Sequence, residues 1–293
     1  MNKSENLKLL LPSPLEELHD DRASHAELRI FLKRDDLINP EIPGNKWRKL
    51  KYNIAVARAE GHTKLLTFGG AYSNHLRAVA AAGYYFDFQT IGIVRGEEHL
   101  PLNPTLSYAQ DHGMELHYLD RTSYRSKGSV EALRKLRGRF GDFYLIPEGG
   151  SNELGIRGCA ELPAEITQPF DVICCSCGTG GTLAGVAAGL SAGRQALGFP
   201  VLKGGEFLTG EINRLQREAF GYDSGNWTLE CGFHFGGFAK SNSHLADFIE
   251  DFRRRHTIVL EWVYEAKMMY GLFELIRRET FSPGTAIVAI LNE

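Results

Sequence analysis

Short apolar runs alternate with longer stretches of helical periodicity along most of the chain. KLLTF at 64–68 and DVICCSC at 171–177 have the length and apolar character of buried strands. SNHLRAVAAAG at 73–83 has the spacing of a helix, with Ser73 or Asn74 as its N-cap and its last glycine as its stop. Because parallel strands need a long crossover between them, helices of this length favour parallel sheets. The sequence therefore predicts an α/β fold with parallel-rich, twisted sheets flanked by helices.

The same alternation continues to the end of the chain. Further strands are predicted at 90–94, 114–119, 143–147, 200–204, 227–233 and 286–291. Further helices are predicted over the apolar stripe of Trp47, Leu50, Ile54 and Ala57, ending at Gly61, and at 104–113, 129–141, 178–190, 211–220 and 245–255.

Two glycine-rich segments, near residues 43 and 149, are the best candidates for domain boundaries. A chain of 293 residues is long for one domain and typical of two, and its 43% of hydrophobic residues can form a sizeable core. No repeat of fixed period is visible. The expected arrangement is a larger, discontinuous domain of residues 1–47 and 149–293, with residues 48–148 inserted as a smaller α/β domain.

Charge and composition argue against several classes of protein. The net charge of −3 disfavours nucleic acid as a partner. The N-terminal apolar run is only three leucines before Pro12, and no run approaches the ~18 residues of a membrane-spanning helix, so neither a signal peptide nor a membrane anchor is expected. Five cysteines, an odd number, with no export signal suit a reducing cytoplasm.

Three cysteines crowd one predicted strand, but their spacing differs from that of metal sites. Cys174, Cys175 and Cys177 have no second cysteine pair or histidine cluster downstream. Strand residues alternate between the two faces of a sheet, so the three thiols are not expected to meet at one ion. They are predicted to be small buried hydrophobes, and no metal site is expected.

SCGTGGTLAG, at 176–185, is the strongest single motif. An apolar strand meets three glycines and two threonines and then a helix, so backbone N–H groups and hydroxyls are available to an anion. It is neither a P-loop nor a G-x-G-x-x-G fingerprint. Phosphate binding and a close-packed turn between strand and helix both remain open. In the first case, a side chain at Gly180 is expected to occupy the place of a phosphate oxygen.

PGNKWRKLKYN, at 43–53, concentrates positive charge at the start of a predicted helix. Lys46 is open to two interpretations, an ordinary solvated lysine or an amine nucleophile. The second is favoured where a helix N-terminus and cationic neighbours such as Arg48 and Lys49 lower the pKa of the amine. Those neighbours are equally open to pointing into water.

Two further motifs have both a structural and a functional interpretation. In GGAYSNH, Ser73 and Asn74 either cap a helix or face a ligand carboxylate or ring oxygen. In WVYEAK, Tyr264 and Glu265 follow a strand-like run and either pack as a buried tyrosine beside a capping glutamate or belong to a site.

Taken together, six motifs resemble one family of enzymes. KRDDL, PGNKWRKL, GGAYSNHLRAVAAAG, PEGGSNELGIRG, CGTGGTLAG and VYEAKMMYGL occur in this order from residue 33 to residue 272. The order resembles the pyridoxal-phosphate enzymes that include 1-aminocyclopropane-1-carboxylate (ACC) deaminase and D-cysteine desulfhydrase. The resemblance implies a tryptophan-synthase-β-like fold of two α/β domains, with pyridoxal 5′-phosphate in the cleft between them.

The resemblance also implies a role for each matching residue. Lys46 matches the lysine that bonds covalently to the cofactor. Asn74 matches the residue that binds the cofactor's 3′ oxygen, and Ser73 lies beside the substrate carboxylate. The match to the phosphate loop comprises Gly178, Thr179, Gly180, Gly181 and Thr182. Tyr264 matches a tyrosine near the substrate, and Glu265 matches the group that faces the pyridine nitrogen.

Several positions depart from the family pattern. Tyr72 replaces the usual glutamine, His75 resembles the desulfhydrases, and Glu265 resembles the deaminases. Phe235 is expected to stand where deaminases carry a second tyrosine. The chain ends at Asn292-Glu293, where relatives are expected to continue through a Gly-Gly turn.

The resulting hypothesis is a cytoplasmic pyridoxal-phosphate lyase or deaminase that releases ammonia and a 2-oxo acid from a small amino acid. ACC deaminase-like activity and D-cysteine desulfhydrase-like β-elimination are the alternatives within it. Relatives are often dimers, so a homodimer is expected. Two rival hypotheses are a cofactor-binding protein with reduced catalysis and a nucleotide-phosphate binder that uses 178–182 and gives Lys46 no role.

Overall fold

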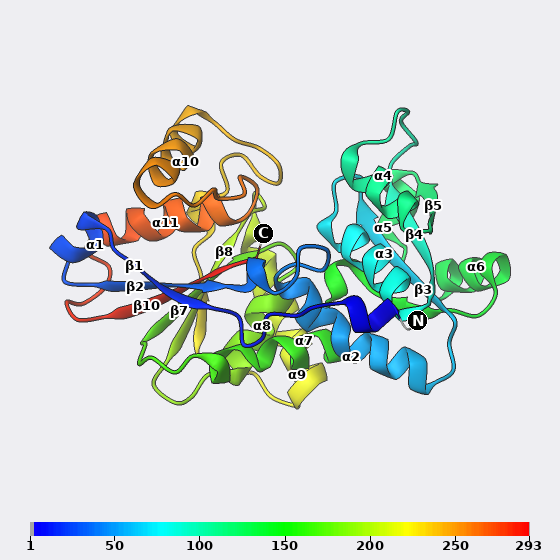
Figure 1. Cartoon of the computed structure of the whole chain (residues 1–293), viewed down its shortest axis with the longest axis horizontal. Helices are drawn as coiled ribbons and strands as arrows, with labels where there is room; N and C mark the ends of the chain where they lie inside the picture. Colours follow the sequence, from blue (N-terminus) through cyan, green and yellow to red (C-terminus); the bar gives the residue numbers. More distant parts are fainter. Residues whose placement is uncertain (1–2, 293) are drawn as a thin grey trace.

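The protein contains two β-sheets, each flanked by helices, in a computed structural model that describes residues 3–292 (Figure 1). In the described chain one sheet has six strands, in the order β1 (Leu15–Leu18), β2 (Arg29–Arg34), β10 (Ala286–Leu291), β7 (Val172–Cys177), β8 (Gln195–Pro200) and β9 (Trp227–Leu229). The other has four, in the order β5 (Met114–Leu119), β4 (Gln89–Arg95), β3 (Lys64–Gly70) and β6 (Tyr144–Ile146). Every pairing is parallel except that of β1 with β2. The predicted α/β class with parallel-rich sheets is confirmed.

Helices of one to four turns connect the strands. The α-helices of the described residues are α1 (Asp21–His25), α2 (Asn45–Ala59), α3 (Asn74–Phe86), α4 (Pro104–Asp111), α5 (Arg121–Arg125), α6 (Val130–Phe140), α7 (Glu153–Ala160), α8 (Gly181–Gly189), α9 (Leu208–Phe220), α10 (Ser243–His256) and α11 (Glu265–Arg277). Short 3₁₀ turns lie at Lys3–Asn6, Asp35–Leu37, Glu148–Gly150, Leu162–Glu165, Gly205–Phe207 and Cys231–Phe233. No described helix is both long enough and apolar enough to cross a membrane.

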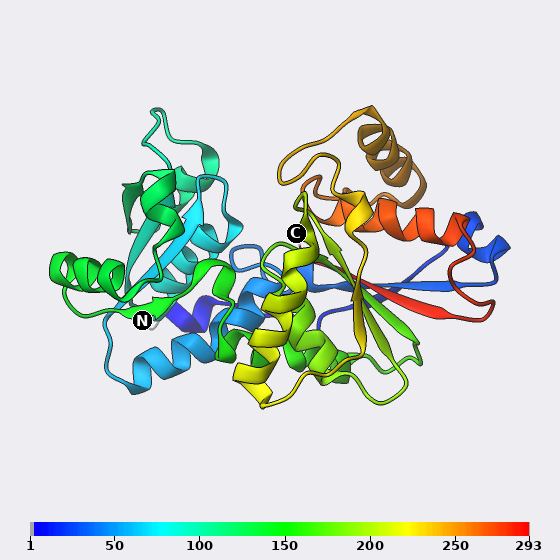
Figure 2. The same ribbon diagram turned by 180° about the vertical axis from the view of Figure 1, so that it is seen from behind.

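Both faces of the six-stranded sheet are covered, because side chains alternate along each strand. Ile30 and Leu32 of β2 pack with α1, α10 and α11 on one face, whereas Phe31 packs with α7, α8 and α9 on the other (Figures 1 and 2). The same alternation separates Cys174 from Cys175 and Cys177, and all three thiols are buried. The prediction that these cysteines divide between the two faces as small hydrophobes is confirmed.

The four-stranded sheet has cores of its own. On one side α2, α3 and α4 pack against residues such as Leu65 and Ile146, and on the other α5 and α6 pack against Phe68. The predicted boundary at 47–48 falls inside α2, and Ile42 and Leu50 share one core across it. The division into residues 1–47 with 149–293 and residues 48–148 stays a prediction.

Some predicted elements are wrong. The strand expected at 200–204 lies earlier, at β8, and the strand expected at 227–233 ends at Leu229. The residues directly before Tyr264, 257–263, form no strand, and β1, whose sequence LEEL is half charged, gave no apolar signal.

Helix α3, which packs against the four-stranded sheet, ends later than predicted. Gly83 lies inside α3 and does not stop it. A Cβ there would lie 2.3 Å from Thr90 Cγ2, so the glycine permits close packing of helix and sheet. The helix instead ends at Phe86, and Asp87 caps it in the left-handed conformation, with φ of 56°.

Candidate active site

A pocket of about 530 Å³ lies between the two sheets. Its wall is built by segments that follow the carboxyl ends of strands, such as β3 and β6 in one sheet and β7 and β10 in the other. This edge is where parallel α/β sheets bind their ligands. The structure brings every predicted site residue to this one wall: Lys46, Ser73, Asn74, Gly178, Thr179, Gly180, Gly181, Thr182, Tyr264 and Glu265.

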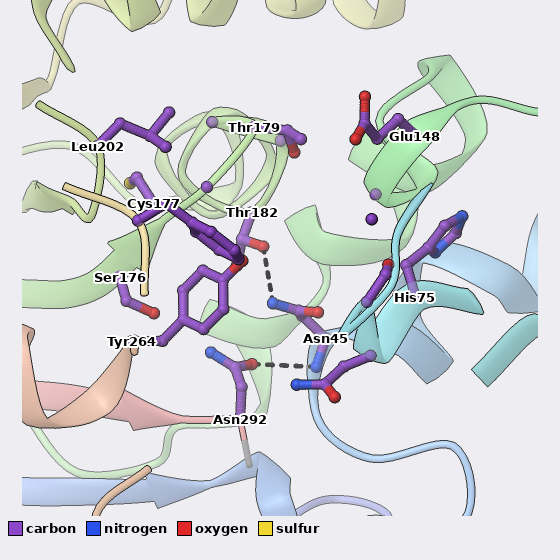
Figure 3. Close-up of a pocket in the computed structure, with 18 of the residues that line it drawn as sticks. Asn45, His75, Glu148, Ser176, Cys177, Thr179, Thr182, Leu202, Tyr264 and Asn292 are labelled. Atoms are coloured by element: carbon purple, nitrogen blue, oxygen red, sulfur yellow. Dashed lines mark hydrogen bonds between the residues drawn. The ribbon is translucent and has the colours of Figure 1, made fainter. Parts of the chain in front are cut away.

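The glycine-rich loop enters α8 at the pocket. Gly180 precedes the helix in a left-handed conformation, with φ of 78°, and no side chain caps the first turn. Thr179 Oγ1 lies 2.6 Å from Ser151 Oγ, and Thr182 Oγ1 accepts a hydrogen bond of 3.1 Å from Asn45 Nδ2 (Figure 3). The uncapped N–H groups at the start of α8 are therefore available to an anion in the pocket.

The glycines of this loop differ in what surrounds them. A Cβ at Gly178 would lie 3.2 Å from Tyr264 Oη, at the pocket wall. A Cβ at Gly180 would instead lie 2.8 Å from Ile212 Cγ1, against α9. The expectation that a side chain at Gly180 occupies a phosphate position is wrong, because that direction leads into the hydrophobic core.

The basic residues of α2 have separate environments. Lys46 Nζ lies in the pocket wall and donates to Asn45 Oδ1 at 2.7 Å. Lys49 is buried and donates to Gly149 O at 3.0 Å, and burial, followed by the charge of Lys46, lowers the pKa of Lys49 to about 8 although nearby thiols oppose the shift. Lys51 pairs with Glu161 at the surface.

Arg48 belongs to a buried ion-pair network and does not line the pocket. Its guanidinium donates to Asp35 at 2.6 and 2.8 Å and to Glu165 at 2.7 and 2.9 Å. Lys33 Nζ joins Glu165 at 2.9 Å. Arg48 and Lys49 are both buried, so neither points into water. Of the four basic residues of this segment, Lys46 and Lys49 line the pocket and Arg48 and Lys51 do not.

A chain of hydrogen bonds joins α2 to the end of β10 and the start of α11. Asn45 N donates to Asn292 Oδ1 at 3.0 Å (Figure 3). Asn292 N in turn donates to Glu265 Oε1 at 3.2 Å. A Cβ at Gly44 would lie 2.2 Å from Asn292 O, so only glycine, here with φ of 58°, allows this approach. Sequence reasoning missed both asparagines as site residues, although Asn45 lies inside the quoted PGNK motif.

The start of α3 contributes polar groups from the four-stranded half. Ser73 is the N-cap of α3 and accepts from Leu76 N at 3.4 Å, so the capping interpretation holds while Ser73 also lines the pocket. His75 is buried, with Nε2 2.9 Å from Thr67 Oγ1. Burial, then the charges of Lys46 and Lys49, lowers the pKa of His75 to about 3, so this ring is neutral at neutral pH.

Tyr264 has an aromatic neighbour that differs from the predicted one. The ring of Phe238 lies 6.0 Å from that of Tyr264, at 71°, and lines the pocket. Phe235 packs its ring 4.9 Å from Tyr270 against the core beneath α11 and is not among the pocket-lining residues of the described chain. The expectation that Phe235 stands at the site is wrong, and the phenylalanine that lies beside Tyr264 in the pocket wall is Phe238.

This set of groups suits a phosphorylated aromatic cofactor. The first turn of α8 offers N–H donors, and Lys46 and Lys49 supply basic groups to the same pocket. Asn292 Nδ2 is buried, lines the pocket and has no hydrogen-bond partner among the described residues, so it is available to a bound group. No group of side chains in the described chain has the arrangement of a metal site.

Comparison with known proteins gives one consistent family. The model of the family described as "Pyridoxal-phosphate dependent enzyme" matches residues 8–293. A putative 1-aminocyclopropane-1-carboxylate deaminase of Pyrococcus horikoshii is 31% identical over 85% of this chain and 80% of its own. The bifunctional D-cysteine desulfhydrase/1-aminocyclopropane-1-carboxylate deaminase, mitochondrial, of Arabidopsis thaliana is 31% identical over 85% and 68%.

The solved structures agree with these relatives. A crystal structure of an ACC deaminase homologue superimposes with a TM-score of 0.83 at 29% identity, over 97% of this chain and 90% of its own. The predicted family, two-sheet fold and cofactor class are confirmed. This chain belongs to the pyridoxal-phosphate dependent enzymes.

Proposed function

We propose that this enzyme is a lyase or deaminase that releases ammonia and a 2-oxo acid from a small amino acid. The observation that carries the proposal is the convergence of Lys46, the N-terminus of α8 and Glu265 on one pocket. Relatives named ACC deaminase and D-cysteine desulfhydrase, at about 30% identity over most of the chain, support the choice of reaction. When bound, the cofactor supplies an electron sink for a carbanion.

We assign the residues to roles by their chemistry. Lys46 would provide the primary amine that holds the cofactor and that moves protons when it is free, and its Nζ donates to Asn45 Oδ1. The loop from Gly178 to Thr182 holds the phosphate through the first turn of α8. Glu265, whose Oε1 accepts from Asn292 N, would face the ring nitrogen of the bound cofactor and keep it protonated.

The substrate side of the pocket is assigned to residues from both sheets. Ser73 and Asn74, at the start of α3, bind the substrate carboxylate and the 3′ oxygen of the cofactor. Tyr264 supplies a hydroxyl next to the substrate, and Phe238 closes that side with a ring that has no hydroxyl.

ACC and D-cysteine are the two candidate substrates. Phe238 favours D-cysteine, whereas Glu265 favours ACC. ACC has no α-hydrogen, so opening its ring needs an extra nucleophile or base that phenylalanine lacks. β-Elimination from D-cysteine needs only removal of the α-proton and a thiol leaving group. A carboxylate at the ring nitrogen, in contrast, favours the more difficult ring opening. We infer poor ACC deamination, with D-cysteine or a related β-substituted amino acid turned over at least as well.

An activity screen tests this proposal. Purified enzyme is incubated with ACC and with both enantiomers of cysteine and serine, and the 2-oxo acid is measured. Release from at least one of them, abolished in Lys46→Ala, is the expected result. No release from any, in protein that binds the cofactor through Lys46, would favour the alternative of a cofactor-binding protein with reduced catalysis. We further propose a cytoplasmic location and a homodimer, which fractionation and sedimentation would test.

A further inference from the structure

The segment from Cys231 to Lys240 brings Phe238 to the pocket in an unusual backbone conformation. Four of its residues have positive φ: Phe235 at 52°, Gly236 at 94°, Gly237 at 120° and Ala239 at 50°. Phenylalanine and alanine rarely adopt this region, so other contacts must hold the loop. Within the loop, Gly237 N donates to His234 O at 3.0 Å, Lys240 N donates to Gly237 O at 3.1 Å, and Gly236 N donates to His234 Nδ1 at 2.9 Å.

A buried lysine provides the missing contacts. Lys267, on α11, is 1% exposed, and its Nζ donates to His234 O at 3.0 Å and to Gly237 O at 2.8 Å. These are the same two carbonyls that close the turn of the loop, so each accepts two hydrogen bonds. A buried ammonium is costly unless it is paired. Burial lowers the pKa of Lys267 to about 8, and the Glu261 carboxylate opposes this shift.

The lysine also links this loop to Tyr264. Tyr264 is the N-cap of α11 and Lys267 lies three residues later, so the first turn of one helix carries both. Gly237, one of the two anchored residues, directly precedes Phe238, whose ring meets that of Tyr264. The position of the Phe238 ring therefore depends on an anchor that does not itself line the pocket.

We propose that Lys267 is a positioning residue that fixes the 231–240 loop, so that Phe238 forms a rigid wall on the substrate side and limits the size of the group carried on the substrate's Cβ. The inference rests on the proposed function only in taking an amino acid as the substrate. The anchoring itself is a property of the protein alone and has its own test.

Hydrogen exchange followed by mass spectrometry tests the anchor. Lys267→Met keeps the length and the apolar stem of the side chain but removes both donors. The amides of Gly237 and Lys240 should exchange roughly tenfold faster or more, as expected for the loss of a hydrogen bond to a charged group. Lys240→Met, which removes an exposed lysine from the same loop, is the matched control and should leave the exchange unchanged. Unchanged exchange in Lys267→Met would overturn the proposal.

A double-mutant cycle tests the effect on specificity. In both Lys267→Met and Phe238→Ala, the ratio of kcat/KM for S-benzylcysteine to that for cysteine should rise, in the enantiomer that the enzyme accepts. The double variant should show no further rise, because both changes remove the same wall. Additive effects would show that Lys267 does not act through Phe238, and a Lys267→Met variant that lowers both values equally would show that Lys267 serves stability alone.

Two results separate failure of this inference from failure of the proposed function. If no amino acid is turned over, the proposed function fails, and the exchange experiment still decides whether Lys267 holds the loop. If Lys267→Met does not fold, exchange is measured in the wild-type protein. There the amides of Gly237 and Lys240 should open together with those of α11, and much faster local opening would overturn the anchor.

Discussion

Lys46 and Arg48 lie two positions apart on α2, but Lys46 lines the pocket and Arg48 stabilises the fold. The amine of Lys46 lies in the pocket wall, whereas the guanidinium of Arg48 is buried with Asp35 and Glu165. The ion pairs fix the helix from which Lys46 extends. At the residue scale, a run of basic side chains thus divides into one proposed cofactor lysine, one buried lysine at its side and one structural arginine.

Lys46→Ala should abolish covalent attachment of the cofactor, because only the primary amine of Lys46 is held in the pocket by Asn45. The visible absorption of the bound cofactor should disappear, and reduction with borohydride should leave no labelled peptide. Lys51→Ala, on the same helix but paired with Glu161 at the surface, is the control and should keep both signals. A label mapped to Lys49 or Lys51 in the wild-type protein would contradict the assignment.

Glu165 should make the protein sensitive to acid. Burial alone would raise the pKa of Glu165, but hydrogen bonds and charge from Arg48 and Lys33 outweigh burial and lower it to about 2 from 4.5. A carboxyl whose pKa is lower in the folded state contributes stability above its unfolded pKa and loses it as the pH falls. The free energy of unfolding should therefore decrease between about pH 4.5 and pH 2.

Glu165→Gln tests this dependence by urea unfolding across the same range of pH. The variant should be less stable at neutral pH and should lose much of the slope below pH 4.5. Asp247→Asn, at an exposed aspartate of α10, provides a control in which the slope stays. An unchanged slope in Glu165→Gln would assign the acid sensitivity to other carboxyl groups.

Phe238→Tyr should raise ACC turnover selectively, by about tenfold or more if the new hydroxyl takes part in proton transfer. The ring already faces Tyr264 in the pocket, so the change adds only an oxygen. Rates with ACC and with cysteine are compared. Phe235→Tyr, at a ring that packs on Tyr270, is the matched control and should leave the ratio of the two rates unchanged. Efficient ACC turnover by the wild-type enzyme would show that the hydroxyl is not needed.

At the scale of elements, the turn into α8 separates two demands on glycine. Gly178→Ala should weaken cofactor binding with little effect on folding, because its Cβ would lie 3.2 Å from Tyr264 Oη. Gly180→Val should instead lower the free energy of unfolding, by about 1–3 kcal/mol, because its φ is 78° and Ile212 blocks the side chain. Cofactor titration and urea unfolding of both variants measure the two effects. The reverse outcome would mean that the loop binds its ligand from the other side.

Elements and motifs were predictable where their signals are local. The strand and helix at 171–189 and the site residues at the turn between them are contiguous in sequence, so spacing alone identified them. Asn292 and Phe238 could not be found in this way, because the pairing of β10 with β2 and the left-handed turn at 235–239 decide where they lie. Lys267 resembled an ordinary helix residue, and only burial distinguishes it. Strand β1 lies at the edge of the sheet, where charged residues are tolerated and apolar alternation disappears.

At the scale of the whole molecule, the pocket joins two halves that have separate cores. The hydrophobic clusters around the six-stranded sheet and those around the four-stranded sheet are distinct. Figures 1 and 2 show the two sheets on opposite sides of the region where the chain ends. A ligand bound by Ser73 and Asn74 on one side and by α8 on the other therefore holds the halves together.

Removal of the cofactor should make unfolding less cooperative. Without it, the two halves should unfold in two steps in urea, as followed by fluorescence and far-UV circular dichroism. With it, the transitions should coincide and move to higher urea, since a ligand at 100 times its Kd adds about 2.7 kcal/mol. Coincident transitions in both forms would contradict the proposed division at residues 48–148.

The place of Asn292 has a practical consequence for anyone who purifies this protein. Its side chain and backbone bind Asn45 and Glu265, only one residue from where an affinity tag would be joined at the C-terminal end of this sequence. A fusion at this end could disturb the hydrogen bonds of Asn292 with Asn45 and Glu265. A tag at the N-terminal end would be separated from Asn292 by almost the whole sequence. A weakly coloured preparation carrying a C-terminal tag would then reflect the choice of vector rather than the chemistry of the enzyme.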